Sequence, residues 1–558
     1  MSFKVYKFAI LNNKRDQMPL RKKIWILYLL ALCARISVEA QDEQKTKPIE
    51  LPNFIIEGVE NLNIGSGVKQ LPKKPAQLTK AELDSINPLE KQQSLLLPLD
   101  SLPSGVTRSE INTGHFKGEL GRYLTPKLEG GWSYYYKEYL FYAGGGLESS
   151  DGHIIGSDFN KLNLSLFSDY LAPEKFWIFG GSKTRSGLNF SNNNFAQFAN
   201  PGFPRRNNVF LSAFIESEGN FEGASFQTGS SFRTTQINGA LSSGHENYFN
   251  GWLNIDNLVT YSFERNRINQ SIIIGSDCFL KVGALNSNSI YFAQVAAKGK
   301  YSAGDIIYKF KLGIQSSQGS SKSNFGVIID ASSLIPIDKN FTMRTNFRSG
   351  LENSSLENFI RYNPYLKGDA IIDFAYQKVD LKGTIDYHPN ETSQYSGAVR
   401  LRVVSDYPII ALSDSLSFTI FNKNALLFDV LLEGYKYITN EDIISFSADF
   451  IYWDQSTGDA KLLPSISPVN LTIDYKHKWD YNIGTNIGLK FTGNRYADME
   501  NKIVIGGFLN VSAGIEYGFR KDLTAYLKFD NLTNSDIVIW NGYKERNLFM
   551  TLGAIWQF

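Results

Sequence analysis

The sequence has only two cysteines and five histidines among its 558 residues. So few cysteines exclude a scaffold held by disulfides, and so few histidines argue against a histidine-rich metal site. Basic and acidic residues nearly balance, with 57 Lys and Arg against 55 Asp and Glu and a net charge of +2. This balance lacks the positive excess that neutralises nucleic-acid phosphates. We therefore expect no nucleic-acid partner and no cofactor.

Long apolar runs are also missing, since none reaches the roughly 20 residues that a membrane-spanning helix needs. The longest run, Ile24–Ala34, follows the basic residues Arg21–Lys23 and precedes a small-residue site ending at Ala40. A basic head, a short apolar middle and a small-residue exit are typical of a secretory signal peptide. Residues 1–40 are therefore predicted to be a signal peptide, with Met18 as the true start. The alternative is a short membrane anchor.

Residues 41–110 are polar and rich in proline, lysine and glutamine. This composition predicts an extended or partly disordered periplasmic arm that either hangs free or enters the interior of the next domain. One run in the arm, LPNFIIEGV at 51–59, has the character of a short strand. Its apolar residues are Leu51, Phe54, Ile55 and Ile56.

From residue 111 to 558, segments of strand length alternate apolar with polar residues, and clusters of Gly, Asn, Asp, Ser or Pro separate them. Tyr308, Phe310 and Leu312, for example, alternate with Lys309 and Lys311. The stretch contains roughly 20 to 25 such segments and no long amphipathic helix. It therefore predicts an all-β domain.

An exported chain with this many alternating segments fits a large antiparallel transmembrane β-barrel better than a soluble sandwich. Closure removes the edges that so large an open sheet would expose. No repeat of about 40 to 50 residues supports a propeller. Aromatics are 14% of the chain, and those at Trp132–Tyr136, Trp453 and Trp540 are expected in interfacial girdles.

The chain ends in an alternating segment, NLFMTLGAIWQF, that closes on an aromatic residue. An unpaired last strand can add to an open edge of the machinery that inserts barrels into the outer membrane. We therefore predict a barrel insertion signal on one face of this strand. Its residues are Leu548, Met550, Leu552, Trp556 and Phe558.

The last 65 or so residues contain, in this order, Asn494-Arg495-Tyr496, the strand 505–517, the turn Asp530-Asn531-Leu532-Thr533-Asn534, Gly542-Tyr543 and the terminal Phe558. In this order of motifs the segment resembles the end of a TonB-dependent receptor barrel. The resemblance implies an outer-membrane barrel of about 22 strands in a Gram-negative-type bacterium.

The resemblance does not extend to the folded plug that family members carry before the barrel. The arm is too short for one and lacks its Arg-Gly and Asp-Gly-Val motifs. A separately encoded plug or a surface lid protein is one expected partner. TonB or another periplasmic protein is a second, because family members often pair an extended apolar segment with TonB, and 51–59 stands in that position. The alternative for 51–59 is a strand that docks in the lumen.

No zinc, nucleophile-elbow or phosphate-loop motif is present. The pairs Asp151 with His153 and Asp386 with His388 are candidates for a catalytic site at the barrel rim, but solvated loop residues are the commoner explanation for such pairs. The chain is therefore predicted not to be an enzyme.

Two further sets of residues are candidates for function. The stretch 192–206, NNNFAQFANPGFPRR, is predicted to be the longest irregular segment of the barrel region and an extracellular loop. It is either a plain external loop, a constriction folded inward, or a binding segment for an anionic surface partner. Its candidate residues are Phe195, Phe198, Arg205 and Arg206. Basic residues that alternate with apolar ones are predicted to line a polar lumen, namely Lys309, Lys311, Arg400 and Arg402.

These predictions describe a transport-related outer-membrane barrel, embedded in lipid, that serves as a conduit or docking platform for a polar solute or a partner protein. The alternative is a non-transporting structural or interaction protein whose lumen is sealed by residues 41–110.

Overall fold

The computed structural model describes residues 114–558, apart from 175–179, 200–201, 203, 222, 240–241, 266–267, 414–416 and 456–461. The predicted signal peptide and the periplasmic arm lie outside the described residues. So do the strand-like residues Leu51, Phe54, Ile55 and Ile56.

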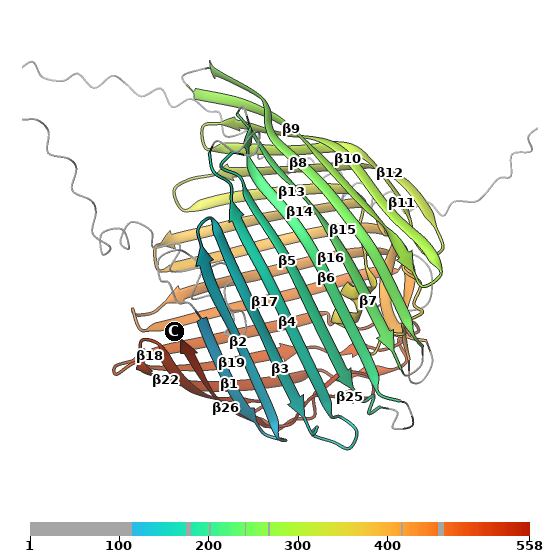
Figure 1. Cartoon of the computed structure of the whole chain (residues 1–558), viewed down its shortest axis with the longest axis vertical. Coiled ribbons are helices and arrows are strands. Elements are labelled where there is room, and N and C mark those ends of the chain that lie inside the picture. The colour runs from blue at the N-terminus through green and yellow to red at the C-terminus, as the bar shows by residue number, and fades with distance from the viewer. Residues whose placement is uncertain are drawn as a thin grey trace, which may run out of the picture. The chain divides into compact units, whose positions relative to one another are not determined.

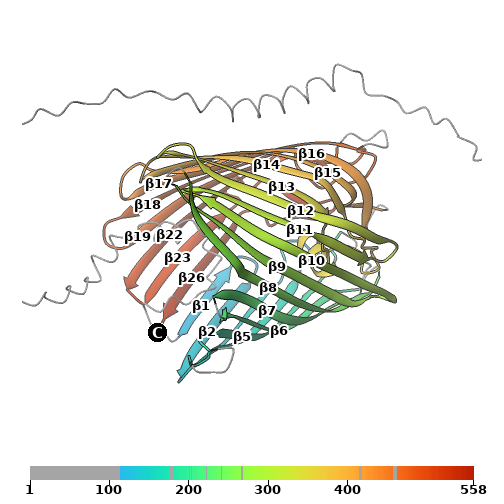
Figure 2. The ribbon, with the colours of Figure 1, turned by 90° about the horizontal axis from the view of Figure 1, so that it is seen from above.

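Twenty-two antiparallel strands form one sheet, which closes on itself where β1 pairs with β26 (Figures 1 and 2). In the closing pair His115 lies opposite Gln557, and Gly121 lies opposite Thr551. The predicted all-β fold, a large antiparallel barrel of 22 strands, is confirmed.

The strands of the barrel are β1 (Gly114–Gly121), β2 (Thr125–Tyr136), β3 (Tyr139–Ser150), β4 (Phe159–Leu171), β5 (Lys183–Phe195), β6 (Arg206–Phe221), β7 (Ala224–Asn238), β8 (Gly244–Arg265), β9 (Ile268–Leu285), β10 (Asn288–Ala303), β11 (Ile306–Gln318), β12 (Ser323–Pro336), β13 (Phe341–Leu351), β14 (Tyr376–Asn390), β15 (Ser393–Leu412), β16 (Phe418–Tyr437), β17 (Asp442–Gln455), β18 (Val469–Trp479), β19 (Ile483–Thr492), β22 (Phe508–Arg520), β23 (Leu523–Asp530) and β26 (Phe549–Gln557).

Short elements lie in the connections. β20 (Arg495–Tyr496) pairs with β21 (Val504–Ile505), and β24 (Val538–Trp540) pairs with β25 (Tyr543–Lys544). The helix α4 (Leu356–Tyr362) lies between β13 and β14. Within the described part of the chain, helices are too short and too polar to cross a bilayer.

The alternation predicted from the sequence sorts side chains onto the two faces of the wall. On β11, Phe310, Leu312 and Ile314 are exposed, whereas Lys311 and Gln315 on the other face form hydrogen bonds. Exposed apolar residues continue in this way from strand to strand. An outward apolar belt around a closed sheet is the surface of a membrane-spanning barrel.

Only some of the aromatic residues predicted for the interfacial girdles are exposed. Trp132, Tyr134 and Tyr136 are exposed near the end of β2, as an interfacial position requires. The prediction was wrong for Trp453 and Trp540, which are both buried. Trp453 packs in an apolar cluster with residues of β15 and β16, and Trp540 packs with Phe418.

Glycine lets aromatic rings lie flat against the wall. A Cβ on Gly131 of β2 or on Gly144 of β3 would collide with the side-chain hydroxyl of Tyr142. The ring therefore covers both glycines, where any other residue would push it away.

The two ends of the barrel differ in their connections. The termini end carries Gly114, Phe558 and two-residue turns such as 137–138, 304–305 and 391–392. The opposite end, which we call the loop end, carries the connections 352–375, 493–507 and 531–548.

Candidate functional site

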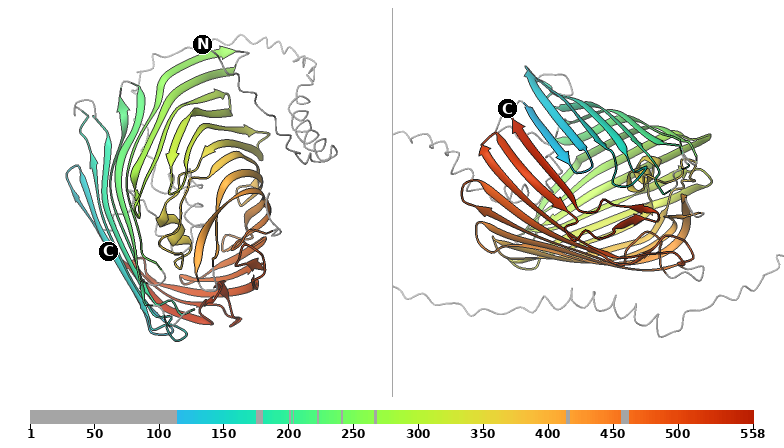
Figure 3. Two further views of the ribbon diagram at one scale, coloured as in Figure 1. Left: turned by 90° about the vertical axis from the view of Figure 1, so that its right-hand side faces the viewer. Right: turned by 90° about the horizontal axis from the view of Figure 1, so that it is seen from below.

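The three long connections at the loop end fold together. We call loops 352–375, 493–507 and 531–548 the cap. Figure 3 shows α4, drawn in yellow, inside the ring of strands. One buried apolar cluster joins the cap to strands on opposite sides of the ring, such as β7 and β16. The cap therefore occupies the barrel interior at the loop end. Its cluster comprises Phe210, Ile237, Leu285, Ile290, Leu356, Ile360, Leu366, Ala370, Ile372, Ile410, Leu412, Phe418, Ile420, Ala497, Ile505, Trp540 and Tyr543.

A fully buried ion pair holds the first part of the cap against the wall. Lys281 of β9 and Glu246 of β8 lie 3.3 Å apart, and each side chain is only 1% exposed. The ammonium of Lys281 donates to the carbonyl of Ser354 at 2.8 Å, and the carboxylate of Glu246 accepts from the backbone N–H of Leu356 at 2.8 Å. Each charged group therefore forms a hydrogen bond to its ion-pair partner and another to the backbone at the start of α4.

The residues behind the resemblance to TonB-dependent receptors organise the rest of the cap. Arg495 donates to the carbonyls of Val538 and Ile539, at 2.5 and 2.8 Å. Asn531 is buried, and its side-chain amide donates to the carbonyl of Ser535 at 2.8 Å while its oxygen accepts from the backbone N–H of the same residue at 3.1 Å. These bonds fix the shape of loop 531–548.

Aromatic rings join the separate loops of the cap. Tyr543 stacks on Tyr365 with ring centroids 3.4 Å apart, which links β25 to the segment after α4. Trp540 meets Tyr362 and Phe418 edge-on, each with centroids 5.4 Å apart. Burial raises the pKa of Tyr543 to about 12, so this ring stays neutral at physiological pH.

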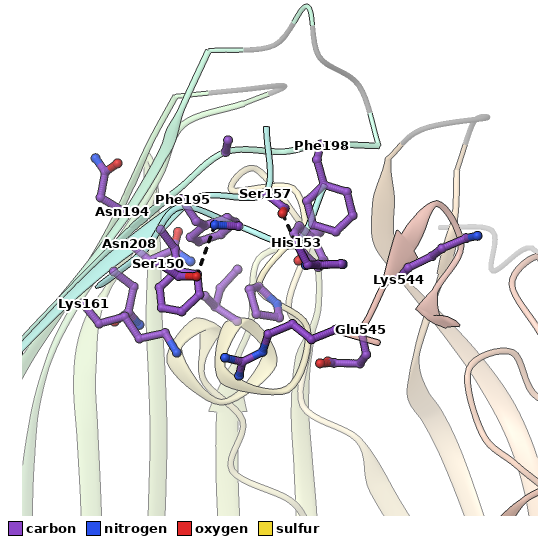
Figure 4. A pocket seen from close by; sticks show the side chains of 18 of the residues that line it. Ser150, His153, Ser157, Lys161, Asn194, Phe195, Phe198, Asn208, Lys544 and Glu545 are labelled. Atoms are coloured by element: carbon purple, nitrogen blue, oxygen red, sulfur yellow. Dashed lines mark hydrogen bonds between the residues drawn. The ribbon is translucent and has the colours of Figure 1, made fainter. Parts of the chain in front are cut away.

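A pocket of about 440 Å³ lies between the cap and the wall formed by β4, β5 and β6 (Figure 4). Its lining includes the basic residues Lys161, Arg361, Lys544 and Arg546 and the single acid Glu545. Aromatic rings also line it, contributed by Phe159, Phe195, Phe198 and Tyr365.

Three of the four cations of the pocket form ion pairs with carboxylates that do not line it. Lys161 lies 3.4 Å from Glu148, Arg361 lies 2.9 Å from Glu357, and Lys544 lies 3.1 Å from Asp536. Arg546 instead stands over the ring of Phe549, 3.9 Å from its centroid. The pocket thus offers N–H donors beside aromatic faces, which suits a polar solute with oxygen acceptors.

His153 projects into this pocket, and its Nδ1 lies 3.3 Å from the hydroxyl of Ser157 (Figure 4). Burial lowers the pKa of His153, against opposing effects of the Lys544 backbone and Glu545. In the second rim-site pair, the carboxylate of Asp386 binds Arg344 through both oxygens, at 2.6 and 2.7 Å.

The predicted extracellular loop lies at the loop end but is shorter than expected. Phe195 ends β5 and Arg206 begins β6, so the connection is 196–205. The prediction that 192–206 is the longest irregular stretch was wrong, because Asn192 to Asn194 pair with β4 and β6; within the described ranges the longest connection is 352–375.

Each of the four candidate residues has a partner at the loop end, and Arg205 is exposed. The ring of Phe195 meets Tyr365 edge-on, and that of Phe198 meets Tyr543. Arg205 pairs with Asp158. Arg206 is buried, and its Nε donates to Asn208 at 2.9 Å.

The predicted lumen cations lie on the face opposite the exposed apolar residues. Lys311 pairs with Asp277 of β9. Arg400 binds Asp380 with two bonds, at 2.7 and 2.6 Å, and Arg402 lies 2.9 Å from Asp429. Lys309 is exposed near the termini end of β11.

The last strand has the predicted two faces. Met550, Leu552, Trp556 and Phe558 are exposed, and Leu548 precedes the strand. Phe549 on the other face is buried.

The cap is the part of the site that sequence reasoning missed. Ser355 accepts a bond from the backbone N–H of Asn358 and so caps α4, whose buried residues Leu356 and Ile360 are four apart. This spacing was a readable signal for a short helix. Among the described residues, no cluster of three or more His, Cys, Asp or Glu is placed to hold a metal ion.

No protein-family model and no curated protein matches this chain. Solved structures match over 80% of it. The FrpB iron transporter from Neisseria meningitidis (F5-1 variant) is 7% identical, with 81% of its chain covered and a TM-score of 0.62. The ferric-catecholate import receptor Fiu from E. coli K12 is 9% identical, with 81% covered and a TM-score of 0.59. The copper transporter OprC is 10% identical, with 80% covered and a TM-score of 0.58.

At these identities the likeness concerns the fold alone. The barrel of this chain has the 22-stranded architecture of the TonB-dependent receptors, as the last strands of the sequence indicated.

Proposed function

We propose that this protein is an outer-membrane barrel of a Gram-negative-type bacterium, and that it acts as a gated conduit for a polar solute. The observation that carries the proposal is the cap, which occupies the interior at one end of an otherwise continuous barrel. Short turns face the periplasm and longer loops face outward in barrels of this kind. The termini end therefore faces the periplasm and the cap faces outside.

The cap is the barrier in this proposal. Its α4 segment and loops 493–507 and 531–548 pack on one another through buried apolar side chains, so they close the loop end as a unit. The pocket beside the cap provides N–H donors and aromatic faces where a solute first arrives. A polar solute that binds there and loosens the cap would open the path along the charged inner wall.

The arm supplies the link to the periplasm in this proposal. Its strand-like residues Leu51, Phe54, Ile55 and Ile56 suit pairing with TonB or another periplasmic protein. In this proposal the cap acts as the barrier. No catalytic role is proposed for any residue.

The alternative is a sealed barrel that works as a structural or docking protein. The buried pair of Lys281 and Glu246 favours it, because opening the cap would leave two charges without their partners. The partner would then be a surface or periplasmic protein, and no solute would cross.

Conductance in planar lipid bilayers tests the proposal. The wild type is compared with a variant in which residues 354–374 are replaced by a short Gly-Ser linker. We expect the variant to conduct at least about tenfold more than the wild type, because the largest loop of the barrier is gone. A variant with a Gly-Ser replacement of the turn 304–305 is the matched control and should behave as the wild type.

A barrel that stays closed after loss of 354–374 would contradict the cap as the barrier. A further variant that begins at Glu110 then tells whether residues 41–110 seal the lumen. If that variant does not conduct either, the structural alternative is favoured.

A further inference from the structure

At the termini end, the hairpin β8–β9 extends beyond its neighbour β7, whereas β10 pairs with β9 as far as Gln270. β7 pairs with β8 only as far as Ser225 opposite Asp256, but β8 continues to Arg265. On its other side this extension pairs with β9 up to Arg265 opposite Ile268. Along residues 257–265, β8 therefore has a neighbour on one side and, among the described residues, none on the other. Figure 1 shows the hairpin projecting at the top of the barrel.

A bulge lies between the part of β8 that pairs with β7 and the part that extends beyond it. The register passes from Ile255 opposite Ser276 to Val259 opposite Ile274, so β8 holds extra residues at this point. Asn257 within the bulge has a positive φ of 58°. Across from it, a Cβ on Gly275 would collide with the carbonyl oxygen of Ile255. Asn257 and Gly275 thus allow the backbone to bend at this point, and bulges of this kind change the direction of a strand.

The projecting edge lacks the usual protection against pairing. Natural edge strands are blunted by proline, by lysine or by an inward charge. Here Val259 and Tyr261 are exposed, Tyr261 packs beside Phe263, and the first charge is Glu264 at the tip. Among the described residues, nothing pairs with the backbone of this edge, which is flanked by apolar and aromatic side chains.

This edge lies in water. Unpaired backbone N–H and C=O groups do not occur against lipid, where each would cost several kcal/mol. A nine-residue edge at membrane depth would break that rule, so residues 257–265 project from the bilayer at the end that carries Gly114 and Phe558.

A second copy of the chain does not fit this edge. Two barrels inserted in the same direction are related by an axis along the membrane normal. Barrel strands tilt by about 35–45° from that axis, so the two edges would cross steeply instead of running side by side.

We propose that residues 257–265 of β8 bind an extended strand of a periplasmic protein by β-augmentation. The added strand pairs its backbone with β8 and places β-branched or aromatic residues beside Val259, Tyr261 and Phe263. Its other face, beside Thr260 and Ser262, is polar. The placement in the periplasm rests on the orientation in the proposed function, but the binding is independent of any solute.

Hydrogen exchange measured by mass spectrometry tests the proposal with the full chain. Peptides that cover 257–265 are compared between native outer-membrane vesicles, which retain the periplasmic partner, and the purified protein in detergent. We expect these amides to exchange at least about tenfold more slowly in the vesicles, because the added strand holds them. Equal exchange in both samples would overturn the proposal. Slow exchange that persists after purification would also overturn it, because the edge would then be covered by the chain itself.

Substitutions test whether the edge 257–265 is the surface that binds the added strand. Tyr261→Lys places a charge on the edge, and Tyr481→Lys is the matched control, since Tyr481 is an exposed tyrosine in the turn 480–482 at the same end. We expect Tyr261→Lys to abolish the protection in vesicles and Tyr481→Lys to keep it. The outer-membrane yield and heat-shifted mobility of both variants report folding separately. Protection that survives Tyr261→Lys in a folded barrel would argue against strand addition here.

Because conductance plays no part in this test, failure of the strand-addition proposal and failure of the gated-conduit proposal are distinguishable.

Discussion

At the scale of residues, the cap depends on a few buried polar groups. Lys281 and Glu246 satisfy each other and also the backbone at the start of α4. The alternation along β8 and β9 puts both residues on the inner face. Nothing in the sequence says that they meet, because they are 35 positions apart and belong to different strands.

Removing one partner of this pair should loosen the cap. Lys281→Met leaves the carboxylate of Glu246 buried without its cation, a change that typically costs about 3–5 kcal/mol. We expect faster proteolysis within 352–375 and a higher conductance than the wild type. Lys502→Met is the control, since Lys502 pairs with Glu500 on the exposed surface. An intact cap in Lys281→Met would mean that the apolar cluster alone holds it.

We expect the stability of the folded barrel to depend on pH through His153. Because burial lowers its pKa, the folded pocket favours the neutral ring. The stability that this gives is fully present above the ordinary pKa of about 6.5 and is lost as the pH falls through the lowered value. The temperature of the mobility shift in gels should therefore fall on acidification, and less so in His153→Asn. An identical pH profile in both proteins would exclude His153 as the cause.

At the scale of elements, the strands were predictable and the cap was not. Each strand shows its two faces in its own residues, as Phe310 and Lys311 do on β11. The cap forms from loops far apart in the sequence, and outside α4 its apolar residues, such as Leu366 and Ile505, follow no period. The interfacial position predicted for Trp453 and Trp540 was wrong for a related reason. An aromatic residue near a strand end can pack in a buried cluster as readily as it can lie in an interfacial girdle.

The last strand gives a prediction at this scale. β26 pairs with both β23 and β1, and its exposed face ends in Trp556 and Phe558. Deletion of Phe558 should strongly reduce the amount of assembled barrel in the outer membrane, since its two backbone bonds to Gly114 and the last residue of the proposed insertion signal are lost. Phe558→Tyr keeps the ring and should assemble normally. Quantitative blots of membrane fractions measure both. Normal assembly after the deletion would remove Phe558 from the signal.

At the scale of the whole molecule, closure makes the barrel a single cooperative unit. All 22 strands have a partner on both sides, but within the described ranges stretches such as 257–265 of β8 and 418–424 of β16 lack a neighbouring strand on one side. The number of strands was predictable from the spacing of alternating segments and from the resemblance. The extra length of β8 was not, because a bulge is invisible in an alternating pattern that continues on both sides of it.

A closed ring of this size should resist detergent. We expect the unheated protein to migrate in SDS gels as a compact species and to shift to slower mobility only after boiling, because no strand can leave without breaking two ladders of hydrogen bonds. The linker variant that lacks 354–374 serves as the comparison and should keep the shift, since the wall is unchanged. A single mobility at all temperatures would be inconsistent with the closed barrel.

The meeting of Gly114 and Phe558 has one more consequence. The N–H of Gly114 donates to the carbonyl of Phe558 at 2.6 Å, and the reverse bond is 2.8 Å. Around the ring, the wall has no natural beginning. A gene reordered so that the chain starts at residue 306 and ends at residue 303, with a short linker from 558 to 114, encodes the same wall. The position of the chain ends is thus independent of the barrel that the strands form. In such a permuted chain the final strand would be β10.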